Sequence, residues 1–235
     1  MTDLLVNEVG KDDKIIQYKV KFSFNITYIL LLTTATIILI EALRTKNTNV
    51  RNILNLEIAI SVIAGYFYSA FVAKISDSYD KNKKIDWGDI NKTRYIDWFI
   101  TTPLMLLALC LVLSSEIGST VKLHIIFSIV LLNYLMLYIG YLGETNVLNK
   151  GISTIIGFIF FGLMYFIIFY NFVLPKYKLS NYVLFTLYLV VWSVYGIVYL
   201  LDEENKNLVF NVLDLISKCF VGLGLWAYYT KVIVL

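Results

Sequence analysis

The chain has 235 residues, of which 59% are apolar and only 16% are charged, and its mean hydropathy is +0.73. Soluble domains carry about 25% charged residues, so this composition excludes an ordinary soluble globule and predicts a protein surrounded by the lipid bilayer. The net charge is only +3, and no basic stripe is interleaved with aromatic residues, which excludes nucleic acid as an expected partner.

The first residues differ from the rest of the chain. Charged side chains interrupt every apolar stretch in the segment 1–22, and no apolar run there ends in a small-residue cleavage site, so we expect no removable signal peptide. We expect residues 23–235 to form a single transmembrane domain. Cys110 and Cys219 lie in apolar runs whose spacing suggests neither a disulfide framework nor a metal site.

Seven stretches are long and apolar enough to cross a membrane, which takes about 20 residues each. They are 23–43, 53–75, 91–113, 121–142, 151–174, 180–201 and 208–232. The polar gaps between them are short, so neighbouring helices must run antiparallel. The sequence therefore predicts an all-α membrane protein, a seven-transmembrane-helix up-and-down bundle. Lysines and arginines are equally numerous on its two sides, so they do not orient it.

The last stretch carries two opposite charges in its middle. Asp214 and Lys218 are four residues apart, a spacing that places them on one face of a helix. An ionisable pair inside a membrane is expensive and is a functional-site hypothesis by default. A structural ion pair that joins two helices is the alternative.

A second charged group lies in the third stretch. Arg94, Asp97 and Thr101 follow the spacing of one helix face, with Trp98 and Met105 on a neighbouring one. Together with the last stretch they give two carboxylates, one arginine and one lysine that can compensate one another inside a bundle. A buried lysine there is either a fixed cation or an amine that condenses with a carbonyl compound.

Several segments resemble one family. "RYIDWFITTPLMLL" is similar to the third-helix motif of the microbial (type 1) rhodopsins, and "LDLISK" followed by "GLGLW" is similar to their seventh-helix retinal-binding segment. "WSVY" in the sixth stretch, "NYLMLYIGYLG" in the fourth and Tyr68 in the second also match. The resemblance covers the second to seventh helices and implies the microbial rhodopsin fold.

The resemblance implies a covalent cofactor and a set of site residues. Lys218 would bind all-trans retinal as a protonated Schiff base, with Asp97 and Asp214 as its counterion and Arg94 beside them. Asp97 would be the primary proton acceptor, with Thr101 hydrogen-bonded near it. The retinal-binding residues that the resemblance implies are Tyr68, Trp98, Met105, Met136, Gly140, Trp192, Tyr195 and Tyr199.

Some positions depart from the family's pumps. Gly196 replaces a proline and Tyr199 a tryptophan, which we expect to change colour and kinetics rather than the ligand. Asn133 stands where an aspartate is common. Ala108 stands eleven residues after Asp97, where pumps place the carboxylic acid that donates a proton from the cytoplasmic side, so that donor is missing.

Glu57 is the candidate replacement. It precedes Tyr68 by eleven residues, about 16 Å along one helix face, and by the family's topology lies on the cytoplasmic side near Ala108. We expect Glu57 to supply or relay the missing proton. The alternative is an interfacial glutamate beside Arg51 or Arg44.

The leading functional hypothesis is a light-driven outward proton pump with Asp97 as acceptor. The alternatives are a light-gated cation channel and a photosensor with a slow photocycle. An inward pump is disfavoured because the inward pumps of the family usually lack the seventh-helix aspartate, and Asp214 is present. Enzyme activity is not expected. The resemblance also implies protons or small cations as transported ions, an extracellular N-terminus, a cytoplasmic C-terminus, and a homo-oligomer, either a trimer or a pentamer.

Overall fold

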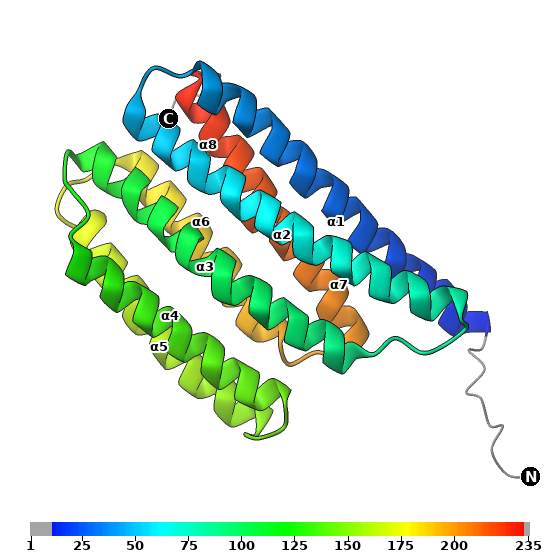
Figure 1. The fold of residues 1–235 in the computed structure, drawn as a ribbon. Helices are drawn as coiled ribbons and strands as arrows, with labels where there is room; N and C mark the ends of the chain where they lie inside the picture. Colours follow the sequence, from blue (N-terminus) through cyan, green and yellow to red (C-terminus); the bar gives the residue numbers. More distant parts are fainter. Residues whose placement is uncertain (1–10, 233–235) are drawn as a thin grey trace, which may run out of the picture.

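The computed structural model describes residues 11–232, which form one bundle of antiparallel helices (Figure 1). The first six helices are α1 (Lys11–Arg44), α2 (Thr48–Asp80), α3 (Trp87–Ile117), α4 (Leu123–Glu144), α5 (Lys150–Phe172) and α6 (Leu179–Val198). The seventh has three consecutive parts, α7 (Glu203–Asp214), the π-helical η1 (Leu215–Phe220) and α8 (Val221–Tyr229). Within residues 11–232, seven helices are long and apolar enough to span a membrane, so the predicted fold is confirmed.

Several helices extend beyond the predicted apolar stretches. α1 begins at Lys11, so the expected boundary at residue 22 falls inside a helix, while residues 1–10 lie outside the described part of the chain. The last helix begins at Glu203 rather than at residue 208. Hydropathy marks the stretch that can lie in lipid, whereas capping side chains and turns fix where a helix begins and ends.

The caps are found at the short loops. Asn47, Asn149 and Asp202 each precede a helix and accept hydrogen bonds from backbone N–H groups of its first turn. These side chains satisfy donors that have no partner within the helix. Gly118 ends α3 in the left-handed conformation, with φ of 70°, where a residue without Cβ is favoured.

The helices differ in burial. In the most apolar part of α3, 61% of the residues are buried, and in the last helix 56%, against 11% in α4. α3 and the last helix are therefore the central ones, and charges on them can be shielded from lipid. We call the half of the bundle that contains Arg94 and the α2–α3, α4–α5 and α6–α7 loops the Arg94 half. The opposite half, with Glu57 in α2, is the Glu57 half.

Candidate functional site

An ionic cluster lies between α3 and the last helix. Lys218 Nζ is 3.1 Å from Asp97 Oδ2 and 3.3 Å from Asp214 Oδ1, and all three side chains are at most 1% exposed. Lys218 lies in η1, and single π-helical turns of this kind are frequent at functional sites. Charges this deeply buried are tolerated only when they are paired.

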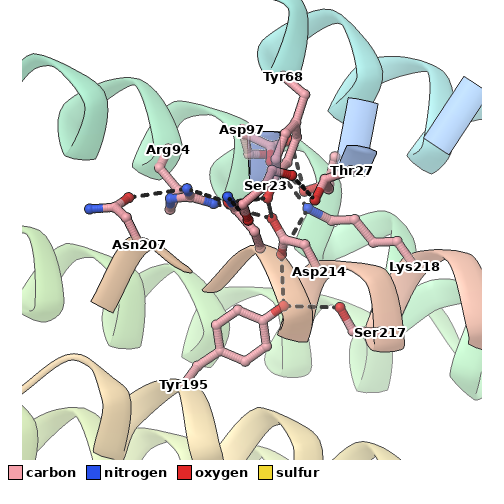
Figure 2. Close-up of polar contacts among 12 residues, drawn as sticks. Ser23, Thr27, Tyr68, Arg94, Asp97, Tyr195, Asn207, Asp214, Ser217 and Lys218 are labelled. Atoms are coloured by element: carbon pink, nitrogen blue, oxygen red, sulfur yellow. Dashed lines mark hydrogen bonds and ion pairs between the residues drawn. The ribbon is translucent and has the colours of Figure 1, made fainter. Parts of the chain in front are cut away.

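Arg94 completes the cluster from the other side. Its Nη1 is 3.3 Å from Asp214 Oδ2, and its Nη2 donates to Asn207 Oδ1 at 3.1 Å and to Asn211 Oδ1 at 3.0 Å. Figure 2 shows Arg94 and Lys218 reaching Asp214 from opposite sides. The two cations balance the two carboxylates, so the cluster as a whole is neutral.

The two carboxylates have different hydrogen-bond partners. Asp214 accepts from the hydroxyl groups of Tyr68 and Tyr195, each at 2.7 Å. Asp97 accepts from Lys218, and from Thr101 Oγ1 at 3.3 Å, a hydroxyl that also donates to the Asp97 carbonyl oxygen at 2.8 Å. Because hydrogen bonds to a carboxylate favour its charged form, Asp214 is held more firmly as an anion than Asp97.

An apolar cavity extends from Lys218 between α3, α4, α5, α6 and the last helix. It is lined by Tyr95, Trp98, Thr102, Met105, Met136, Leu137, Gly140, Ser153, Thr154, Gly157, Phe158, Phe161, Trp192, Tyr195, Gly196, Tyr199, Phe210, Asp214, Ser217 and Lys218. Every residue expected to bind retinal lines this cavity except Tyr68. Tyr68 lies in the ionic cluster, where Arg94 donates to its hydroxyl at 3.1 Å.

Sequence reasoning missed the wall that α5 contributes. Phe158 and Phe161 line the cavity, yet in an apolar membrane helix such residues carry no signal that separates a binding face from a lipid face. Thr102 was also missed. Its hydroxyl accepts from Asn133 Nδ2 at 2.8 Å, so Asn133 joins α4 to α3 behind the cavity.

Glu57 is buried rather than interfacial. Glu57 is only 2% exposed, and its Oε1 atom has no hydrogen-bond partner among the described residues. An added Cβ on Gly222 would lie 3.2 Å from Glu57 Oε2, so the carboxyl group packs against the last helix. Gly222 follows Lys218 by about 6 Å of helix. The alternative of an interfacial glutamate beside Arg44 or Arg51 is therefore wrong.

The fold and the cluster define a class: a seven-helix membrane protein with a buried lysine, two carboxylates and an adjoining apolar cavity. Residues 19–232 match the sequence model of the family described as "Bacteriorhodopsin-like protein". The chain therefore belongs to this family of microbial rhodopsins.

Two curated relatives cover part of the chain. Green-light absorbing proteorhodopsin of Gamma-proteobacterium EBAC31A08 is 26% identical over 172 residues, which are 65% of this chain and 67% of the relative. Sensory rhodopsin-2 of Haloarcula vallismortis is 31% identical over 151 residues, which are 57% of this chain and 60% of the relative.

Solved structures agree with the fold over most of the chain. The crystal structure of viral rhodopsin OLPVRII has a TM-score of 0.84 and 43% identity, and the match covers 92% of this chain and 99% of that one. Blue light-absorbing proteorhodopsin from Med12 has a TM-score of 0.70 at 21% identity, over 90% of this chain and 96% of that one.

Members of this family bind retinal through a lysine. The residues present here fit such a ligand. The cavity presents one primary amine, from Lys218, in a wall made largely of aromatic and aliphatic side chains. Two carboxylates within 3.3 Å of that amine can balance a positive charge held on its nitrogen.

Proposed function

We propose that this rhodopsin is a light-driven outward proton pump in which Asp97 accepts the proton. The observation that carries the proposal is the 3.1 Å contact between Lys218 Nζ and Asp97 Oδ2, fully buried at the end of the apolar cavity. All-trans retinal, bound to Lys218 as a protonated Schiff base, would supply light absorption. Its isomerisation would change the surroundings of the Lys218 nitrogen.

Asp97 is the better acceptor of the two carboxylates. Asp214 accepts from two tyrosine hydroxyls and is paired with Arg94, and all of these interactions favour its charged form. Asp97 has weaker support from Thr101. A proton leaving the Lys218 nitrogen for Asp97 Oδ2 crosses a hydrogen bond that already exists, and afterwards Asp214 and Arg94 still balance each other.

Glu57 is proposed to return a proton to the Lys218 nitrogen. A buried carboxyl group with an oxygen that lacks a hydrogen-bond partner favours its neutral, protonated form, because burial without partners penalises charge. Its place beside Gly222, one helical turn past Lys218, puts the donor in the Glu57 half, while Arg94 lies beyond the acceptor in the other half. With the N-terminus extracellular, as the resemblance implies, protons would move outward.

Two alternatives stay open. The relative named sensory rhodopsin-2 favours a photosensor, and for that function Ala108 in place of a donor fits a slow photocycle. A light-gated cation channel would need a path through the Arg94 half, where ion pairs link α7 to α4 and to α5. The assembly is proposed to be a homo-oligomer, a trimer or a pentamer.

The test uses cells that express the protein and receive retinal. External pH is recorded in an unbuffered suspension under illumination, with and without a protonophore. Light-induced acidification that the protonophore abolishes supports the outward pump, and alkalinisation contradicts its direction. If pH does not change, the pump is rejected and voltage clamp separates the alternatives, because a channel current reverses with the ion gradient and a sensor gives none.

A further inference from the structure

A second fully buried lysine lies in the Arg94 half, away from the cavity. Lys206, in the first turn of α7, is 0% exposed. Its Nζ is 2.8 Å from Glu144 Oε1, at the end of α4, and 2.8 Å from Glu203 Oε1, at the start of α7. One ammonium group therefore holds two carboxylates from two helices.

Asn91 in α3 bridges the same two carboxylates. Its Nδ2 donates to Glu144 Oε1 at 2.6 Å and also to Glu203 Oε2. Its Oδ1 accepts from Asn207 Nδ2 at 3.0 Å, and Asn207 Oδ1 in turn accepts from Arg94. Two amides thus join the carboxylate pair to the ionic cluster around Asp214.

The charge balance of the pair depends on Lys206. The other cation in contact is Lys150 in α5, which is 3.4 Å from Glu203 Oε1 and about a third exposed, with a side-chain exposure of 32%. The phenol groups of Tyr95 in α3 and of Tyr199, which directly follows α6, lie near the pair and add no cation, and the Tyr199 hydroxyl donates to the Gly140 carbonyl oxygen at 3.1 Å. Without Lys206, Glu144 and Glu203 would both contact the one amide nitrogen of Asn91, with only Lys150 beside Glu203, and like charges placed this close favour sharing one proton.

We propose that Lys206 keeps Glu144 and Glu203 both ionised, so that this pair cannot store a proton. Lys206 is a positioning residue, since it acts on the two carboxylates and not on the cavity. For the pump proposed above, on which this consequence rests, it means that the Glu144–Glu203 pair releases no proton before Asp97 does. Release then waits until Asp97 gives up its own proton.

The direct test needs no light and no transport. Infrared spectra of the retinal-reconstituted protein in the dark are recorded in H₂O and D₂O for wild type, Lys206→Met, and Lys206→Met combined with Glu203→Gln. We expect Lys206→Met to gain a deuterium-sensitive carboxylic acid band, equivalent to one proton per molecule, that the double variant lacks. Lys150→Met is the matched control and should gain none, because Lys150 contacts Glu203 alone and Lys206 still pairs with both carboxylates.

Two outcomes overturn the proposal: no new band in Lys206→Met, or a carboxylic acid band in the wild type that Glu203→Gln alone removes. Should Lys206→Met not fold, the wild type and Glu203→Gln decide, because a band lost in Glu203→Gln contradicts the proposal and unchanged spectra support it. Under illumination, a pH-sensitive dye should show a new early release in Lys206→Met. If the dark spectra behave as expected but the wild type moves no protons, the pump fails and the role of Lys206 stands.

Discussion

The two halves of the bundle treat buried polar groups in opposite ways. In the Arg94 half, hydrogen bonds and ion pairs run from the central carboxylates through Arg94, Asn207 and Asn91 to Glu203. In the Glu57 half, several buried polar atoms have no hydrogen-bond partner within residues 11–232. Among the described residues, five of the seven buried side-chain atoms without a hydrogen-bond partner lie there, namely Glu57 Oε1, Ser61 Oγ, Tyr165 OH, Asn181 Oδ1 and Tyr229 OH.

This difference separates two tasks. A network in which every carboxylate has a cationic partner and further hydrogen-bond donors holds its charges fixed, because each ionised group is stabilised where it lies. Polar groups buried without partners are costly, and a carboxyl group among them favours its neutral form. The Arg94 half therefore suits the holding of charge, and the Glu57 half suits a carboxylic acid that keeps and then gives up a proton.

The largest expected effect comes from the residue between the halves. Lys218→Ala removes the amine that would bind retinal, so we expect complete loss of visible absorption after retinal is added. Absorption spectra of the purified protein measure this. Lys150→Met, which alters a surface lysine, should keep its colour. If the Lys218→Ala protein is coloured, retinal is not bound through Lys218, and in the wild type this residue forms only a structural ion pair.

The next effect tests the acceptor side. Asp97→Asn keeps the shape of the side chain but cannot take up a proton, so we expect light-driven transport to fall about 100-fold or more, in the range typical of a lost acid–base group. Colour should remain, because Asp214 and Arg94 are untouched. The measurement is the initial rate of light-induced pH change. Asp89→Asn, at the exposed start of α3, is the control, and equal losses in the two variants would argue against a special role for Asp97.

The Glu57 half gives a smaller, kinetic effect. In Glu57→Gln the internal proton source is gone, so the last step of the photocycle should slow at least about tenfold and become slower still as the pH of the protein solution rises. Flash photolysis at several pH values measures this decay. Glu41→Gln in α1 is the matched control and should decay like the wild type. A Glu57→Gln decay that is unchanged and insensitive to pH disproves the donor role.

Much of the fold followed from the sequence, and only part of the site did. Apolar stretches marked the seven helices because lipid demands them, and the spacing of Asp214 and Lys218 placed those two residues on one helix face. The contact of Lys206 with Glu144 joins residues 62 positions apart, and no periodicity reports such a pairing. In the sequence, Lys206 falls in the polar gap between two apolar stretches. In the structure Asp202 caps α7, so Lys206 lies in the first turn of a helix.

The sequence also failed to predict the cavity wall from α5 and the position of Tyr68, for a related reason. Within an apolar helix the face that points inward is chosen by the neighbouring helices, and a single sequence does not contain them. Tyr68 could be assigned to the inner face but not to the ionic cluster, because that depends on Asn211 and Asp214 meeting it from the last helix. Glu57 was placed correctly in the interior because its eleven-residue spacing from Tyr68 lies along one helix.

The smallest predicted effect compares the halves directly through stability. Asn207 accepts from Arg94 and donates to Asn91 and to the Glu203 carbonyl oxygen, so Asn207→Ala leaves buried partners unsatisfied and should cost about 1–3 kcal/mol. Ser61 is buried, and its hydroxyl has no partner among the described residues, so Ser61→Ala should cost almost nothing or stabilise slightly. Loss of visible absorption on heating ranks the two variants. If Ser61→Ala proves the more damaging, the Glu57 half contains polar contacts as firm as those around Arg94, and the division of tasks between the halves does not hold.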